Sequence, residues 1–350
     1  MRPRSSPARR MAMRTEGRSR LRIGPAAGRL ASLELRRSGL AAAALLVAVS
    51  AAPGAAFEAR VLESVVSVLP VWPGHRIGGT PGTPPGSAPE ATAVAVLPGG
   101  LLATALHVVD RAEAITVRLA DGRRFAAELV AGDGGSDLAL LRIPVDLPLL
   151  EPALEPALGA PVCAVGNAFG LDLSVTCGVV SAVRRSGVGF NPVEDFIQTD
   201  ASVNPGASGG ALVDGEGRLV GLLSAIFTKE ADADIGVNFA VSAALLMRVV
   251  EDLAAHGRVL RPASGFRVAD PNPSDAGDAV GVRVVAVAPG GAGEAAGLAE
   301  RDQLTAIGGR AMRKASDATA AIQLQRPGDT VTLEVLREGE PHTLTLELPP

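Results

Sequence analysis

The sequence predicts a mostly β protein whose last part, residues 261–350, forms a separate, small α+β unit. Before that unit the chain is a succession of short apolar runs, among them ATAVAVL, AITVRLA and LVGLLSAIF, and turns such as LADGRR and VDGEGR separate them. Short strands divided by turns indicate an antiparallel sandwich or barrel rather than βαβ units. A single long helical pattern, SAALLMRVVEDLAAHG, closes this β region.

The expected elements follow in order along the chain. LESVVSVLPV is the first strand, and the Gly/Pro-rich segment 73–90 is a loop without periodicity. In the long helix one face is apolar, Ser242 can cap the first turn and Gly257 can end the last. The apolar face consists of Val241, Leu245, Val249 and Leu253.

The segment RVLRPASG reads as a linker, so we place a boundary between residues 260 and 261. Beyond it lie four expected strands and one short helix, which together make a small α+β module. The strands are GFRVAD, VGVRVVAVAP, RDQLTAIGG and TVTLEVLRE, and the helix is KASDATAAIQLQ.

Composition and charge narrow the class of partner. Of the 33 Lys and Arg residues, eleven Arg lie within residues 1–37 beside two acids, so the rest has 33 − 11 = 22 basic and 37 − 2 = 35 acidic residues, a net charge of −13. An acidic body argues against nucleic acid as a partner. The chain also has one Trp and no Tyr, so stacking platforms for bases are scarce.

The first 56 residues have the order of a secretory signal. An Arg pair at Arg36 and Arg37 precedes an uncharged stretch and small residues that end in PGAA, with cleavage expected after Ala56. The alternative is a short membrane anchor, because the uncharged segment is just long enough to span. Either way we expect an exported, periplasmic or extracytoplasmic protein.

Two cysteines, Cys163 and Cys177, lie in the apolar runs PVCAVGN and SVTCGVVSA. If these runs form one hairpin centred near Gly170, the cysteines face each other across it. Export permits a disulfide, for which Cα atoms roughly 4.4–6.8 Å apart are usual, while two buried free thiols are the alternative. Neither the cysteines nor the four scattered histidines have the spacing of a metal site, so we expect no metal and no organic cofactor.

The stretch NPGASGGALV surrounds Ser208 with glycine. GASGG formally matches the nucleophile elbow of α/β-hydrolases, which would suggest an esterase, but that elbow needs strand–turn–helix and here strand–turn–strand follows. The other order of a catalytic triad is His, then Asp, then Ser. His107 follows the run LLATAL, and Asp137 opens SDLALLRI directly before a buried-looking strand. Each alone reads as structural, but together with Ser208 they have the required order beside β-strands.

At these residues the chain resembles a known family. ALHVV, SDLALLRI, VGNAFGLDLSVTCGVVSAV, FIQTDASVNPGASGGALVDGEGRLVGLLSAIF and IGVNFAV are similar, in this order, to motifs of the HtrA (DegP-like) serine proteases. The resemblance implies a trypsin-like double antiparallel β-barrel over residues 57–260 and a PDZ domain over residues 261–350.

The resemblance also implies roles for single residues. His107 is the general base, Asp137 orients it, and Ser208 is the nucleophile. The backbone N–H groups of Gly206 and Ser208 form the oxyanion hole. Three residues of one strand, Ser224, Ala225 and Ile226, contact the substrate, and a loop with an adjoining helix, Phe266, Arg267, Val268 and Ala318–Ile322, binds peptides on the PDZ domain.

Three departures from the family pattern qualify these expectations. Ala207 stands where the family has Asn, and Arg267 replaces a glycine of the PDZ carboxylate loop. The family also has a Gly-Ser-Gly before the strand that here reads ATAVAV, and this chain lacks it. Because alanine cannot bond to neighbouring loops, we expect a partly collapsed oxyanion hole and low basal activity.

The resemblance finally implies an ATP-independent endopeptidase that degrades unfolded or damaged exported proteins, assembled as a homotrimer. C-terminal or extended peptides are the expected partners of the PDZ domain. A catalytically weak or inactive chaperone or peptide-binding protein is the alternative, and Ala207 and Arg267 are the residues that favour it.

Overall fold

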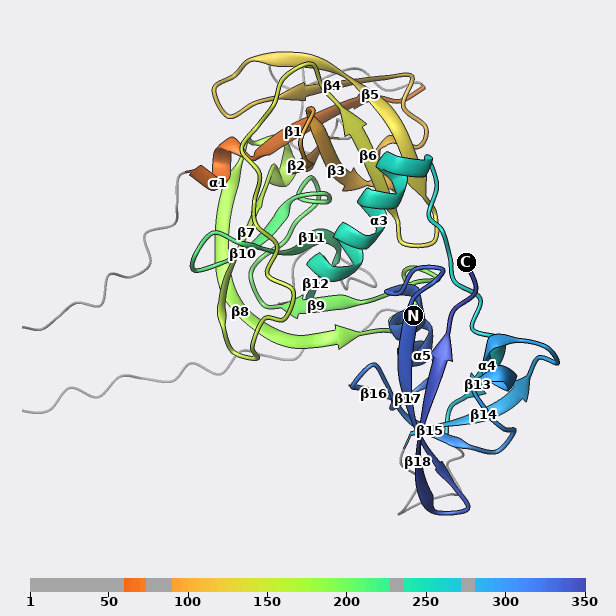
Figure 1. The fold of residues 1–350 in the computed structure, drawn as a ribbon. Coiled ribbons are helices and arrows are strands. Elements are labelled where there is room, and N and C mark those ends of the chain that lie inside the picture. Colours follow the sequence, from red (N-terminus) through yellow and green to blue (C-terminus); the bar gives the residue numbers. More distant parts are fainter. Residues whose placement is uncertain (1–59, 74–89, 227–235, 272–280) are drawn as a thin grey trace, which may run out of the picture. The chain divides into compact units, whose positions relative to one another are not determined.

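Most of the expected strands close into two antiparallel barrels in the computed structural model, which describes residues 60–73, 90–226, 236–271 and 281–350. The expected leader over residues 1–56 and nearly all of the loop 73–90 lie outside the described residues. All described residues belong to one compact unit, Ala52–Pro350. Figure 1 shows the first barrel in orange to yellow and the second in green.

The first barrel has six strands in the order β1-β2-β3-β6-β5-β4. The strands are β1 (Val65–Val71), β2 (Ala91–Leu97), β3 (Leu101–Ala105), β4 (Ala114–Arg118), β5 (Arg124–Asp133) and β6 (Leu138–Arg142). A short helix precedes β1 and another follows β3, namely α1 (Arg60–Glu63) and α2 (Leu106–Val109).

The second barrel has the strand order β10-β11-β12-β9-β8-β7. The strands are β7 (Pro161–Gly166), β8 (Ser174–Arg185), β9 (Phe196–Thr199), β10 (Ala211–Asp214), β11 (Leu219–Ile226) and β12 (Asn238–Ser242), and a 3₁₀ turn, η1 (Ala168–Gly170), lies at the tip of the β7–β8 hairpin.

The apolar runs are continuous because many of these strands are buried on both faces. In β2, Ala93 and Ala95 belong to the core inside the first barrel, whereas Val94 and Val96 belong to a second core that includes side chains of the other barrel and of α3. Alternate residues of a strand point to opposite faces, so a strand between two cores needs apolar residues at every position.

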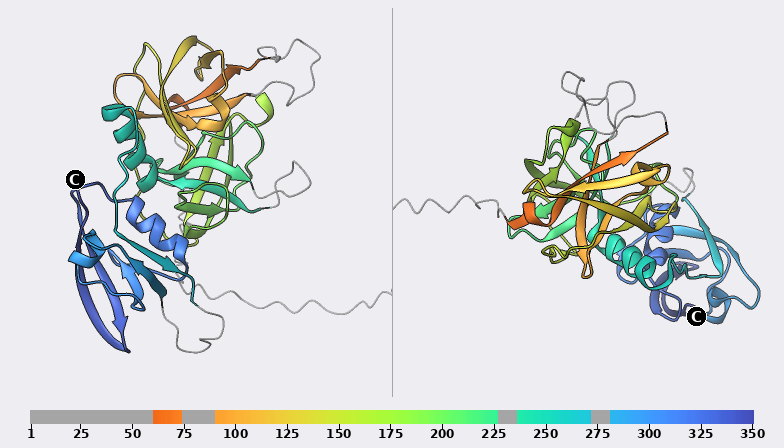
Figure 2. Two further views of the ribbon diagram at one scale, coloured as in Figure 1. Left: turned by 90° about the vertical axis from the view of Figure 1, so that its right-hand side faces the viewer. Right: turned by 90° about the horizontal axis from the view of Figure 1, so that it is seen from above.

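Helix α3 (Ala243–His256) runs along both barrels, as two views agree (Figures 1 and 2). Its apolar face, with Leu245, Val249 and Leu253, is the expected one. The predicted ends are confirmed: the Ser242 hydroxyl accepts a hydrogen bond from the Leu245 N–H, and Gly257 ends the helix with φ of +67°. Glycine is favoured there because a left-handed residue closes the last turn.

The C-terminal unit is a six-stranded sheet with two helices. Its strands are β13 (Phe266–Ala269), β14 (Val282–Val287), β15 (Gln303–Ile307), β16 (Arg310–Ala311), β17 (Thr330–Arg337) and β18 (Glu340–Glu347), and its helices are α4 (Ala292–Ala295) and α5 (Ala315–Gln323). The sheet has its own apolar core, which includes Val284, Leu304 and Ile322. The fold is therefore mostly β, with two trypsin-like barrels and a PDZ-like sheet. In the described part of the chain, no helix is long and apolar enough to span a bilayer.

Candidate active site

His107 and Asp137 are brought together by the pairing of β3 with β6. Leu138, the residue after Asp137, is the register partner of Ala105, two residues before His107. His107 itself lies in the single turn of α2, directly after β3, which is formed by the apolar run that the sequence indicated before it. Its Nδ1 is 2.6 Å from Asp137 Oδ2. This is the bond that fixes the tautomer of a catalytic histidine and leaves Nε2 to accept a proton.

Asp137 holds the histidine through its backbone as well. Its Oδ1 accepts the His107 N–H at 2.9 Å, and its carbonyl accepts the Leu106 N–H at 2.9 Å. Asp137 adopts a left-handed φ of +58°. Aspartate tolerates this region better than most residues, so the conformation suits a turn that must aim its carboxylate at α2.

The Asp137 carboxylate also sets the basicity of the imidazole. The pKa of His107 is raised above its ordinary value of 6.5, chiefly by the hydrogen bond to Asp137, while partial burial acts in the opposite direction. A more basic imidazole is a stronger proton acceptor, which is the task of a general base.

Ser208 lies in the turn before β10, and the flanking glycines are required there by close contacts. Gly206 and Gly209 have φ of +98° and +84°. A Cβ at Gly206 would collide with the Asn167 carbonyl, and one at Gly209 would collide with the Thr92 carbonyl. The glycines therefore allow two other segments to approach the backbone around the serine.

Each carbonyl of the turn that precedes Ser208 is held by a donor. The Pro205 carbonyl accepts a hydrogen bond from the Phe169 N–H at 2.7 Å, and the Gly206 carbonyl accepts one from the Thr92 hydroxyl at 2.8 Å. The Ala207 carbonyl accepts one from the Gly210 N–H at 2.8 Å. Within the described residues, the N–H groups of Gly206 and Ser208 donate to no protein acceptor. They are thus available to an oxyanion.

This arrangement differs from the partly collapsed hole that the sequence suggested. Ala207 is buried beneath Gly166, and its N–H donates to the Asn204 carbonyl at 3.0 Å. The bonds expected of an Asn side chain at this position are unnecessary here, because Thr92 and Phe169 reach the turn from other segments.

The serine turn is tied to the strand that leads to His107. The Thr92 N–H donates to the Ser208 carbonyl at 3.0 Å, and the Thr104 hydroxyl donates to the Thr92 carbonyl at 2.7 Å, three residues before His107. In the described part of the chain the Ser208 hydroxyl itself makes no hydrogen bond. Catalytic hydrogen bonds are often long before substrate binds.

The segment expected to bind substrate is the end of β11. Ser224 is buried there, and the next two residues, Ala225 and Ile226, pair with Phe239 and Asn238 of β12. The Gly209 N–H donates to the Leu223 carbonyl at 2.7 Å, so this strand also adjoins the serine turn.

A groove on the C-terminal sheet brings together the expected peptide-binding residues. Its volume is about 290 Å³, and both β13 and α5 line it. The lining includes Phe266, Arg267, Val268, Ala318 and Ile322. Arg267 is exposed, whereas the two neighbouring apolar side chains are half-buried.

Two known domain families match this chain. Residues 91–222 match the family of trypsin-like peptidase domains, and residues 233–348 match the PDZ domain family. The solved structure of the HtrA-type protease AlgW with a tripeptide is 33% identical, with a TM-score of 0.64, and the match covers 83% of this chain and 94% of that one. The chain belongs to the HtrA-type proteases.

Sequence identity to curated proteases of this family supports the same assignment. The periplasmic serine endoprotease DegP of Escherichia coli (strain K12) is 36% identical over 71% of this chain and 54% of its own length. Protease Do-like 1, chloroplastic, of Arabidopsis thaliana is 34% identical over 72% of this chain and 61% of its own length. The chain thus spans little more than half the length of these relatives.

The two cysteines of this HtrA-type chain pair across the β7–β8 hairpin. Cys163 and Cys177 are register partners, as a hairpin centred near Gly170 requires, and their Sγ atoms are 2.07 Å apart. Their Cα atoms are 4.0 Å apart, closer than the expected range. Directly opposed residues of antiparallel strands approach to about 4.5 Å even without a bond, so the cross-strand register favours a separation at the short end of that range.

Three further residues support this HtrA-type site, and the sequence did not predict them: Thr92, Asn167 and Phe169. The available signal was the strand ATAVAVL, in which Thr92 is the one polar residue of an otherwise apolar run. Its contacts with the serine turn join residues more than one hundred positions apart, so only the folded chain reveals them.

Proposed function

We propose that the chain is a serine endopeptidase that uses Ser208, His107 and Asp137. His107 Nε2 takes the Ser208 hydroxyl proton as Oγ bonds to the scissile carbonyl carbon. The resulting oxyanion accepts the Gly206 and Ser208 N–H groups. The C–N bond then breaks as the amine leaves with the proton from His107, and water hydrolyses the acyl-enzyme by the same proton transfers.

The observation that carries this proposal is the 2.6 Å bond between His107 and Asp137, together with a serine turn whose Gly206 and Ser208 amides donate to no acceptor in the described part of the chain. In a serine protease, such a carboxylate fixes the tautomer of the imidazole and stabilises the imidazolium that forms during proton transfer. The proposal requires Ser208 Oγ to close on His107 Nε2 when substrate binds, as Michaelis complexes commonly do.

The division of the chain into residues 1–56, 57–260 and 261–350 is part of the proposal. Helix α3 shares a core with both barrels, which supports its place in the protease domain. The periplasmic names of curated relatives support an exported protein and, with it, unfolded or damaged exported polypeptides as substrates.

We assign the groove between β13 and α5 to extended or C-terminal peptides. HtrA-type proteases solved with a tripeptide and with a decapeptide match the chain. The apolar side chains of Phe266, Val268 and Ile322 suit an apolar peptide residue, and β13 offers an edge for an added strand. Arg267 supplies positive charge for the terminal carboxylate in place of the family's glycine.

A homotrimer is proposed from family membership alone. Sedimentation equilibrium of the mature protein tests it, with a mass three times that of the chain as the expected result. A mass equal to that of one chain would contradict it.

The test of the activity is to incubate mature protein with unfolded casein and with a small ester, alongside the Ser208→Ala variant. We expect casein cleavage by the wild type and roughly a 10⁶-fold loss in the variant, the order found when the nucleophile of a triad is removed. Substantial casein cleavage by Ser208→Ala would refute the assignment. Ester hydrolysis without casein cleavage would indicate an esterase. Suppressed casein aggregation without cleavage would indicate the chaperone alternative.

A further inference from the structure

Thr92 is a fully buried residue at the start of β2, and its polar groups all meet the active-site region. Its N–H donates to the Ser208 carbonyl, and its carbonyl accepts the Thr104 hydroxyl. Its own hydroxyl donates to the Gly206 carbonyl at 2.8 Å and accepts the Asn167 N–H at 2.9 Å. A threonine hydroxyl has one proton to donate, and here that proton goes to the oxyanion-hole turn.

The orientation of the turn depends on which carbonyls are held. In a planar trans peptide the C=O and the N–H point in opposite directions. The Pro205 carbonyl therefore sets the Gly206 N–H, and the Ala207 carbonyl sets the Ser208 N–H. The peptide between these two donors is the one from Gly206 to Ala207, and Thr92 holds its carbonyl.

The Thr92 hydroxyl also connects the tip of the β7–β8 hairpin to the serine turn. It accepts the N–H of Asn167, and the Asn167 side chain donates to Glu90 Oε2 at 2.7 Å. Two residues later, the Phe169 N–H holds the Pro205 carbonyl. The tip of the β7–β8 hairpin and the serine turn thus meet at one buried hydroxyl.

We propose that Thr92 is a positioning residue whose hydroxyl keeps the Gly206 and Ser208 N–H groups aimed at the oxyanion. Its catalytic consequence rests on the proposed peptidase function, whereas its effect on the turn does not. Loss of the hydroxyl leaves the Gly206 carbonyl and the Asn167 N–H buried without this partner. The central peptide then keeps only the bond from the Ala207 N–H to the Asn204 carbonyl, so its rotation costs less than in the wild type. A rotated peptide stabilises the transition state less and the bound substrate equally well, so it lowers kcat and leaves KM unchanged.

The decisive pair of variants is Thr92→Val, which keeps the shape and removes the hydroxyl, and Thr92→Ser, which keeps the hydroxyl. Thr199→Val is the matched control. The Thr199 hydroxyl is equally buried, donates to the Val179 carbonyl at 2.8 Å and accepts the Ala201 N–H at 3.0 Å, but it has no bond to the serine turn. If Thr92→Val and Thr199→Val have comparable melting temperatures, both have lost a similar amount of stability with the buried hydroxyl. Any loss of kcat seen only in Thr92→Val then reports the loss of positioning.

Two measurements are made on the full chain. On a short peptide amide, we expect Thr92→Val to lower kcat by about 10- to 100-fold, below the ~10²–10³ of a lost oxyanion donor, with KM within about twofold. Affinity for a peptide boronate, whose tetrahedral adduct uses the oxyanion hole, should fall by a similar factor. Thr92→Ser and Thr199→Val should retain kcat within a few-fold of wild type.

The second measurement is amide hydrogen exchange over residues 204–210, which needs no activity. Faster exchange there in Thr92→Val, with wild-type exchange in Thr92→Ser and Thr199→Val, supports the proposal. Wild-type kcat and wild-type exchange in folded Thr92→Val would overturn it, as would equal losses of kcat in Thr92→Ser. If the wild type cleaves no peptide, the proposed function fails, and hydrogen exchange alone decides whether Thr92 positions the turn.

Discussion

At the scale of single residues, Asp137 carries several of the constraints that make His107 a base. One carboxylate oxygen bonds the imidazole, the other bonds the His107 N–H, and the carbonyl bonds the Leu106 N–H. The left-handed backbone of Asp137 makes this threefold contact possible. Removing the negative charge while keeping the shape therefore tests the base without removing the turn.

The acid limb of kcat/KM should report the raised pKa of His107. Catalysis needs a neutral imidazole, so a raised pKa keeps His107 protonated to higher pH, and activity should fall as pH drops through a value above 6.5. Asp137→Asn should move this limb to lower pH and reduce the plateau on the order of 10⁴-fold, as in the serine-protease template. A pH–rate profile checks both. A wild-type limb below 6.5, or an unmoved limb in the variant, would contradict the assigned cause.

At Ala207 the structure reverses the expected effect of restoring asparagine. Because Ala207 is buried beneath Gly166 and the turn is already held, Ala207→Asn should not raise basal kcat. Burial of an amide without full partners should lower the free energy of unfolding by about 1–3 kcal/mol. Urea unfolding and kcat on a short peptide measure the two effects. Ala207→Ser is the smaller polar control, and increased kcat in the asparagine variant would show that the hole is not fully formed.

Among the elements, the β7–β8 hairpin carries the disulfide in its strands and contacts the oxyanion-hole turn with its tip. Cys163 and Cys177 join its strands, whereas its tip bonds Thr92 and Pro205. The tip is further anchored to the first barrel by Arg118, whose guanidinium is 2.5 Å from Asp172. The hairpin is thus an element that both barrels hold in place.

Removal of the disulfide should destabilise this hairpin. The cysteines are 14 residues apart, and closing a loop of this size is worth about 3 kcal/mol of unfolding free energy in the chain-entropy account. We expect the double variant Cys163→Ala/Cys177→Ala to lose this amount in urea unfolding. Dithiothreitol should lower the stability of the wild type by a similar amount and leave the variant unchanged. Equal effects of the reductant on both proteins would refute the contribution of the bond.

The groove between β13 and α5 allows a test of carboxylate recognition. Arg267 lines it and is exposed, so its charge can reach a peptide carboxylate. We expect Arg267→Ala to weaken binding of a free C-terminal peptide several-fold, by an amount that salt reduces, since exposed charges are screened. An amidated peptide should bind both proteins equally weakly, as measured by calorimetry. Tighter binding to Arg267→Ala would mean that the arginine obstructs the groove.

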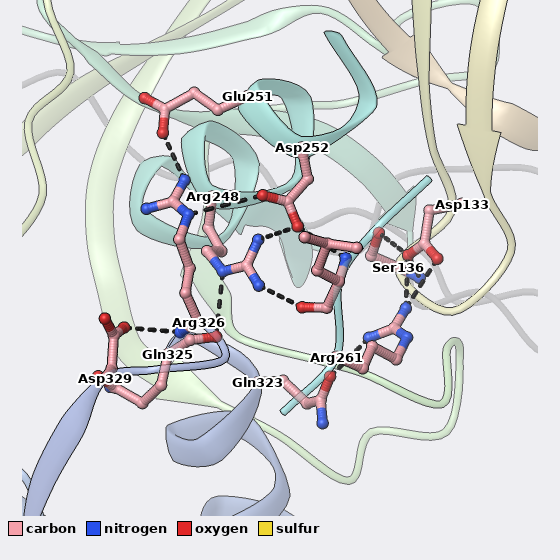
Figure 3. Close-up of polar contacts among 11 residues, drawn as sticks. Asp133, Ser136, Arg248, Glu251, Asp252, Arg261, Gln323, Gln325, Arg326 and Asp329 are labelled. Carbon is pink, nitrogen blue, oxygen red and sulfur yellow. Dashed lines mark hydrogen bonds and ion pairs between the residues drawn. The ribbon is translucent and has the colours of Figure 1, made fainter. Parts of the chain in front are cut away.

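At the scale of the whole molecule, α3 links the barrels to the segment that leads into the last sheet. Figure 3 shows Arg248 of α3 beside Asp252, which it contacts at 2.5 Å. The same guanidinium donates to the carbonyls of Leu260 and Gln325. Burial alone would raise the pKa of Asp252, but hydrogen bonds from Arg248 and the Leu260 N–H outweigh it and lower that pKa.

Loss of Arg248 should be costly because its partner is buried. In Arg248→Met, Asp252 keeps a buried carboxylate with its main partner gone, which typically costs about 3–5 kcal/mol of unfolding free energy. The control is Arg184→Met, whose side chain is 41% exposed beside Glu155, itself 80% exposed, and which should contribute no more than about 1 kcal/mol. Thermal and urea unfolding measure the difference. Similar small losses in both variants would show that solvent reaches the Arg248 pair.

Local chemistry predicted much of the fold. The ends of α3 followed from Ser242 and Gly257, because capping uses groups within a few residues. The pairing of Cys163 with Cys177 followed from the symmetry of one hairpin. The barrels followed from apolar runs and turns only as far as a β region, and the double-barrel architecture came from resemblance to the HtrA family.

Local patterns and the order of motifs were enough to predict the β class of the chain, the helix that closes the barrels and the residues of the candidate triad. The state of the oxyanion-hole turn depends instead on contacts that form only when the chain folds. Ala207 suggested a weak turn because its own side chain forms no hydrogen bond, but the bonds that hold the turn come from Thr92 and Phe169. A backbone carbonyl carries no record in the sequence of which distant donor it will meet, and the closure of the barrels makes that choice.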